Sequence, residues 1–79
     1  ILFRALKEAK AAVKRTPMPA AGLTRQLARL IATQPSARLD YIACFNGETL
    51  KPAGTVSRGT HLALAVFVGK TLLIDNARL

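Results

Sequence analysis

The sequence predicts an α+β domain in which two helices pack on one face of a small, mostly antiparallel sheet that ends in a β-hairpin. Three observations predict it. Residues 2–15 and 19–32 repeat their apolar side chains at helical spacing. From residue 39 onward the chain is rich in residues that favour strands. Gly69-Lys70 then separates two apolar runs with the spacing of a two-residue hairpin loop.

The first helical segment places its apolar residues on one face, at Leu2, Leu6, Ala9 and Val13. The opposite face carries a basic stripe, defined as Arg4, Lys7, Lys10 and Lys14. Lys14 and Arg15 occupy the last turn, where cations interact favourably with the helix dipole. Pro17 and Pro19 follow, so the helix should stop before them.

The second helix should begin near Pro19, because proline suits the first helical position. Its apolar face is Ala20, Leu23, Leu27, Leu30 and Ile31. Arg25 and Arg29 point away from that face. Pro35 sets the end of the helix near Ala32 or Thr33.

The strand pattern starts at Leu39 and runs to Phe45. Asn46-Gly47 predicts a turn, and Thr49-Leu50-Lys51 a short extended piece. Residues 52–60 contain proline, two glycines and several small polar residues, a composition typical of a loop.

The closing hairpin joins His61–Val68 to Thr71–Asp75. A glycine at the first loop position predicts a type II′ turn, which pairs Val68 with Thr71 and fixes every later pair. One face of the hairpin then carries Leu62, Leu64, Val66, Val68 and Leu73. The other face carries Ala63, Ala65, Phe67, Leu72 and Ile74.

Both hairpin faces are therefore apolar, although two helices cover only one face of a small sheet, and the uncovered face of such a sheet is usually polar. We interpret the second face as an interdomain or self-association surface, with Phe67, Leu72 and Ile74 as its candidate residues. Two alternatives stay open: the faces are reversed, or a loop folds over the second face.

The bulk properties describe one small folded domain. The chain has 79 residues, 51% of them hydrophobic, which argues against disorder. No apolar run reaches the length of a membrane span, and no signal-peptide pattern is present. Cys44 is the only cysteine, which excludes an internal disulfide and fits a reducing compartment, so we expect a cytoplasmic protein. The chain lacks an initiator methionine and opens inside a helical pattern, which suggests a piece of something longer.

The net charge is +8, which raises the alternative of a small basic RNA- or DNA-binding module. The basic stripe on the first helix is its best candidate surface. No aromatic residues interleave with the stripe, and on the sheet Phe67 stands nearly alone. A solvated helix face is therefore the favoured interpretation, and a nucleic-acid partner is not expected.

No catalytic, cofactor-binding or metal-binding residue emerges from the motifs. Gly69-Lys70-Thr71 resembles the end of a phosphate-binding loop, but the earlier glycine and the following helix are missing. His61 is the only histidine and has no partner beside it in sequence. The four acids are too scattered for an acid–base pair, and no metal-ligand spacing occurs.

Three blocks, in order, resemble the C-terminal part of the pantothenate synthetase (pantoate–β-alanine ligase) family. Leu2-Phe3-Arg4-Ala5-Leu6 is similar to the family's Leu-Tyr-Arg-Ala-Leu. Leu39-Asp40-Tyr41 and the stretch Asn46 to Pro52 are similar to its Val-Asp-Tyr strand and Asp-Pro-Glu-Thr-Leu-x-Pro turn. The stretch Val68 to Asn76 is similar to its closing Val-Gly-x-Thr-Arg-Leu-Ile-Asp-Asn, the most specific block.

The resemblance implies that residues 1–79 are the C-terminal lid domain of an enzyme that condenses pantoate and β-alanine through a pantoyl adenylate, with ATP and Mg²⁺. The family's nucleotide-binding motifs lie on an N-terminal Rossmann-type domain that is absent here, so the resemblance implies that this piece is inactive alone. That domain is then its partner, and a homodimer is a further possibility. Phe67, Leu72, Ala43 and Asn46-Gly47 depart from the family pattern.

Overall fold

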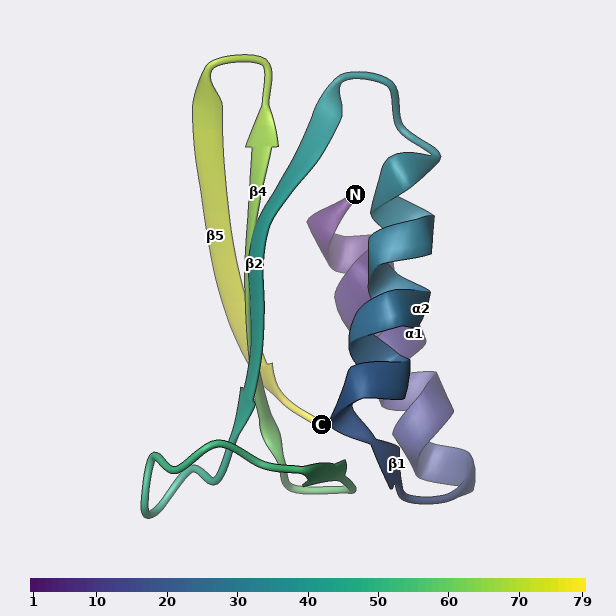
Figure 1. Cartoon of the computed structure of the whole chain (residues 1–79), viewed down its shortest axis with the longest axis vertical. Helices are drawn as coiled ribbons and strands as arrows, with labels where there is room; N and C mark the ends of the chain where they lie inside the picture. Colours follow the sequence, from purple (N-terminus) through teal and green to yellow (C-terminus); the bar gives the residue numbers. More distant parts are fainter.

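The structure is a computed structural model that describes residues 1–79. It contains two helices and five strands, and both helices lie on the same side of the larger sheet (Figure 1). The bounds are α1 Leu2–Arg15, β1 Met18–Pro19, α2 Ala20–Ala32, β2 Ala37–Phe45, β3 Thr55–Val56, β4 His61–Val68 and β5 Thr71–Arg78. The predicted α+β fold is confirmed. Neither helix is long and apolar enough to cross a membrane.

The helices meet the sheet through narrow apolar stripes. In α2 the buried residues are Leu23, Leu27 and Ile31, as the periodicity predicts. In α1 they are Ala5, Ala9 and Val13, while Leu2 and Leu6 are only partly buried. The α1 stripe therefore centres on alanines, with the larger leucines at its edge. Each helix ends where the prolines predict, at Arg15 before Pro17 and at Ala32 before Pro35.

The larger sheet is antiparallel with strand order β2-β4-β5. The hairpin has the predicted register, from Val68 opposite Thr71 to Ala65 opposite Ile74. Gly69 has φ 61° and Lys70 has no positive φ, as a type II′ turn requires. The central strand β4 points Leu62, Leu64 and Val66 toward the helices, and all three are fully buried. β2 begins at Ala37, two residues earlier than predicted, because Ala37 pairs with the last residue of β4, Val68.

The stretch predicted as a loop contains a structural element. Thr55–Val56 forms β3, which pairs antiparallel with β1 at Met18–Pro19 in a separate two-stranded sheet. Val56 lies opposite Met18 and is fully buried in the core. The amide of Ala20 extends this contact by donating to the carbonyl of Gly54 at 2.9 Å. The prediction of loop for residues 52–60 is therefore wrong at these two positions.

The predicted extended piece at Thr49-Leu50-Lys51 is also wrong. The side chain of Asn46 accepts hydrogen bonds from the amides of Glu48 and Thr49, at 2.8 and 3.0 Å. These bonds wind the chain into a turn, and Leu50 follows with φ 61°. The turn chemistry of Asn46 is therefore stronger than the extended preference of the residues after it.

A β-bulge at Asp40 changes the alternation of β2. Leu39 lies opposite Val66 and Tyr41 lies opposite the next residue, Ala65, so Asp40 has no partner on β4. Before the bulge Leu39 faces the helices. After it Ile42 faces them and Tyr41 points away, as the burial along the strand shows.

Candidate functional site

The sheet has one face without a helix over it, the left-hand side in Figure 1, which we call the outer face. Strand register groups its side chains into four rows across β2, β4 and β5. These rows are Arg38–Phe67–Leu72, Tyr41–Ala65–Ile74, Ala43–Ala63–Asn76 and Phe45–His61–Arg78. No loop folds over this face, and the faces are not reversed, since Leu62, Leu64 and Val66 are the residues buried under the helices.

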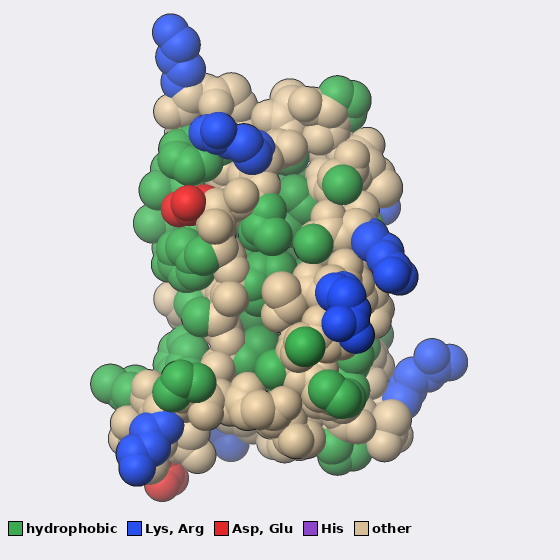
Figure 2. All heavy atoms as spheres, viewed as in Figure 1, with side chains coloured by type: hydrophobic (Ala, Val, Ile, Leu, Met, Phe, Trp, Pro, Cys, Tyr) green, Lys and Arg blue, Asp and Glu red, His purple; other side chains and the backbone are tan.

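The three residues of the sequence-predicted surface lie together at one end of the outer face. Phe67 is the cross-strand partner of Leu72, and Ile74 occupies the neighbouring row. Ile74 is 60% exposed and Leu72 39%, while Phe67 is half-buried. Figure 2 shows hydrophobic side chains along the margin of the molecule where this face is seen edge-on. The apolar face is therefore exposed to solvent in this chain.

Aromatic side chains also gather on the outer face, which sequence reasoning missed. Tyr41 and Phe45 join Phe67 there, so the expectation that Phe67 stands nearly alone is wrong. The guanidinium of Arg38 lies 4.8 Å from the centre of the Phe67 ring, in cation–π geometry. The one available signal was the three-residue spacing from Leu39 to Ile42, which breaks strict alternation and marks the bulge.

The charged residues within the four rows of the outer face are basic. Arg38 and Arg78 lie in its first and last rows, and none of the four rows contains an acid. The basic stripe of α1 is exposed as predicted, but it belongs to the helix layer, on the other side of the sheet from the aromatic rings. The fold therefore does not bring the basic stripe and the aromatic rings onto one surface, as a single-strand nucleic-acid platform requires.

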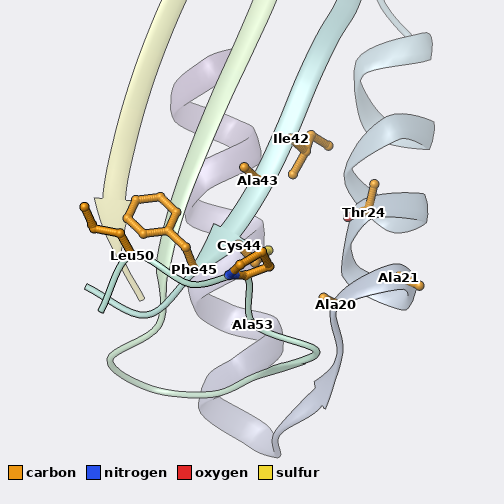
Figure 3. Close-up of a pocket in the computed structure, with 10 residues that line it drawn as sticks. Ala20, Ala21, Thr24, Ile42, Ala43, Cys44, Phe45, Leu50 and Ala53 are labelled. Atoms are coloured by element: carbon orange, nitrogen blue, oxygen red, sulfur yellow. The ribbon is translucent and has the colours of Figure 1, made fainter. Parts of the chain in front are cut away.

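A mostly apolar pocket of about 410 Å³ lies between the start of α2 and the end of β2 (Figure 3). In the close-up, Thr24 on α2 and Ile42 on β2 face one another across the gap, and Cys44 lies near the turn that holds Ala53. The full lining is Ala20, Ala21, Thr24, Ile42, Ala43, Cys44, Phe45, Leu50, Pro52 and Ala53. Cys44 provides its only thiol, and burial raises the pKa of this thiol above its ordinary range.

We expect Cys44 to react slowly with iodoacetamide at neutral pH in the folded chain, because the thiolate is the reactive form. Unfolding in urea should speed the alkylation, and mass spectrometry of quenched samples would measure both rates. The raised folded-state pKa also has a consequence for stability. The contribution of this thiol is present below the unfolded-state pKa and is lost as the pH rises through the folded-state value. Equal alkylation rates in the folded and unfolded chain would contradict the shift.

The polar end of the outer face contains His61. Its ring lies 5.6 Å from that of Phe45, and the backbone of Gly47 approaches it so closely that any side chain at residue 47 would collide with it. Asn46, Glu48 and Arg78 line the same depression, but no hydrogen bond joins His61 to Glu48. His61 therefore packs as a structural residue, and the acids form no pair with it.

The residues considered for Mg²⁺ and for the phosphates of ATP do not fit these groups. No group of three histidine, cysteine, aspartate or glutamate side chains is close enough to hold a metal ion. Gly69-Lys70-Thr71 turns a β-hairpin, whereas a phosphate-binding loop leads into a helix.

Comparison with known proteins gives a consistent result. A model of the Pantoate-beta-alanine ligase family matches residues 1–78. The pantothenate synthetase of Moorella thermoacetica is 40% identical over 75 residues, 95% of this chain and 26% of that protein. That of Caldicellulosiruptor saccharolyticus is 37% identical over 76 residues, covering 96% of this chain and 27% of that protein.

A solved structure agrees in fold. The crystal structure of pantothenate synthetase from Thermus thermophilus superposes on 98% of this chain with a TM-score of 0.73 and 28% identity, and the match covers 28% of that protein. The chain thus spans about a quarter of the length of the relatives it matches. Since the family match extends over nearly all 79 residues, the chain belongs to the pantoate–β-alanine ligase family.

Proposed function

We propose that this chain is the accessory C-terminal domain of an ATP-dependent ligase that joins pantoate to β-alanine, and that it acts as a lid over a catalytic domain elsewhere in the enzyme. The family match over residues 1–78 carries the proposal, together with its restriction to about a quarter of each relative.

The physical task of a lid is the exclusion of water. In the proposed reaction the carboxylate of pantoate is activated by ATP as an acyl adenylate, with release of pyrophosphate. The amine of β-alanine then displaces AMP. Water competes with the amine for the adenylate, so closing an apolar cover over it favours the amide product.

The outer face is the surface we propose for docking on the catalytic domain. It exposes Tyr41, Leu72 and Ile74, which no element of this chain covers. Burying such side chains against a second domain is favourable by about 25 cal/mol for each Å² of apolar surface removed from water. Arg38 and Arg78 at the two ends of the face would contribute positive potential near anionic substrates such as ATP and pantoate.

The proposal predicts that the 79-residue chain alone forms no pantothenate from ATP, pantoate and β-alanine. A chimera in which it replaces the matched region of the Moorella thermoacetica enzyme should be active. Both are measured by AMP release and by product formation. Turnover by the 79-residue chain alone, or a folded chimera without activity, would contradict the proposal.

The docking face is tested within the same chimera. Phe67→Asp should reduce activity by about tenfold or more, since docking would bury an unpaired carboxylate in an apolar interface, and a loss of about 1.4 kcal/mol is tenfold. Phe3→Asp is the matched control, because Phe3 is 77% exposed on α1, in the helix layer, and should leave activity near that of the parent chimera. Thermal melts of both variants separate loss of docking from loss of folding. Equal activity of the two folded variants would place the docking surface elsewhere.

A further inference from the structure

The strand β5 forms an open edge of the larger sheet. It pairs with β4 on one side and with nothing on the other. Seven of its eight residues are exposed, Ala77 being the exception. Edge strands of natural proteins are usually protected by charged residues, proline or a bulge. The stretch Thr71 to Ile74 contains none of these devices.

The hairpin turn determines which backbone groups of β5 are free. In a two-residue hairpin the residues that flank the loop, here Val68 and Thr71, form a hydrogen-bonded pair. Bonding to β4 then recurs at every second residue, so the backbone groups of Leu72, Ile74, Asn76 and Arg78 point away from the sheet. The outward amide of Asn76 already donates to the carboxylate of Asp75, at 2.8 Å. Leu72 and Ile74 are left with free donors and acceptors on a regular strand.

We propose that β5 pairs with β5 of a second copy of this chain, antiparallel about a two-fold axis at Leu73. Leu72 of each copy then lies opposite Ile74 of the other copy. The two three-stranded sheets become one continuous sheet, with both outer faces on the same side. This inference rests on the edge of β5 alone and stands independently of the proposed function.

The backbone favours this register. Leu72 and Ile74 are two successive outward-facing residues whose amides and carbonyls both lack partners, and the proposed axis pairs each with the other. The hydrogen bond between Asp75 and Asn76 stays intact, because Asn76 lies beyond the bonded pairs, opposite Lys70 of the other copy.

The side chains favour it as well. On the outer face, exposed Leu72 meets exposed Ile74 twice. On the helix side, Leu73 is 38% exposed and meets its own symmetry mate. Moving the axis to Ile74 would place Lys70 opposite Arg78, a repulsive pair. Moving it to Leu72 would place Lys70 opposite the apolar Ile74.

An interface made by one strand from each copy is small, so the dimer should be weak and should depend on protein concentration. Sedimentation of the 79-residue chain should therefore show monomers when dilute and dimers when concentrated. Hydrogen exchange should show the amides of Leu72 and Ile74 gaining protection as concentration rises. The amides of Leu73 and Asp75, which already bond to β4, should be protected throughout. A wild-type chain that stays monomeric when concentrated would overturn the proposal.

Ile74→Pro is the decisive variant. Proline removes the outward amide of residue 74 without removing a bond to β4, so the monomer should fold while the dimer is lost. Ile74→Val keeps the amide and should still dimerise. Phe67→Ser changes the outer face on the central strand β4, away from the edge, and should also dimerise. Dimers that survive Ile74→Pro, or that disappear with Phe67→Ser while the chain stays folded, would overturn edge pairing in favour of association through the outer face.

If Ile74→Pro does not fold, the concentration dependence of the wild-type amides decides the matter. Protection at Leu72 and Ile74 that does not change with concentration would contradict the pairing. None of these measurements involves ligase activity, so a failure here leaves the accessory-domain proposal standing. An inactive chimera would likewise leave the edge pairing untouched.

Discussion

Replacing Leu64 with alanine should destabilise the domain by about 2–5 kcal/mol, the usual range for a fully buried leucine. Leu64 lies in the middle of β4, has no exposed surface and packs in the core between sheet and helices. A domain of 79 residues has a total stability of about 4–12 kcal/mol, at roughly 0.05–0.15 kcal/mol per residue. The substitution therefore removes a large part of the free energy of unfolding. Urea unfolding followed by circular dichroism measures it.

The matched control is Leu50→Ala. Leu50 is 71% exposed and follows the Asn46 turn, so the same deletion of side-chain atoms leaves no cavity there. The change in unfolding free energy should be within about 0.5 kcal/mol. Similar losses at the two positions would mean that the sheet and helices do not enclose Leu64 as described.

Replacing Val56 with aspartate should unfold the domain or leave it barely stable at neutral pH. Val56 is fully buried against the helix layer, and a carboxylate there has no partner. The group would have to be protonated or exposed by opening of the β1–β3 pair. Either change costs several kcal/mol, which is exceptional for one substitution and is typical of a buried unpaired charge. Thermal melts at neutral and at acidic pH would show partial recovery as the carboxyl becomes protonated.

Thr55→Asp is its control, one residue away. Thr55 belongs to the same short strand and pairs with Pro19, but its side chain is exposed. The same charge at this position should change stability by about 0.5 kcal/mol or less. If residues 52–60 were only a loop, both variants would behave alike, so the pair of substitutions tests the correction to the sequence-based prediction.

The parts of the fold that the sequence predicted depend on local patterns. Helical spacing and the following prolines predicted both helices to within one residue at their ends. The hairpin needed only Gly69, because its positive φ and the two-residue loop determine every pair along β4 and β5. These features involve neighbours in the chain, so one sequence suffices to predict them.

The parts that were missed depend on contacts between distant residues. β3 is two residues long, too short for any periodicity, and its partner β1 lies at Met18–Pro19. The burial of Val56 follows from that pairing and not from its own neighbours. In the same way, Tyr41 and Phe45 meet Phe67 only because β2 pairs with β4, and their side depends on the bulge.

Part of the candidate surface could be predicted from the sequence. Hairpin register alone placed Phe67, Leu72 and Ile74 on one uncovered face, and the structure has them there. Periodicity gave no sign of the Arg38 guanidinium stacked on Phe67 or of the free edge of β5. The family was predicted from three sequence blocks, of which the closing one is the most specific, and not from a physical pattern; the family match agrees with it.

The bulge at Asp40 has a consequence for how this position can change over evolution. Asp40 is exposed and has no partner on β4, so strand pairing does not determine its chemical identity. The presence of a residue at this position matters, because deleting it would restore strict alternation. The side chains of one half of β2 would then move to the opposite face of the sheet. Ile42 and Cys44 would then face solvent, or Leu39 would, depending on which half moved. Relatives should therefore align with this site without a gap.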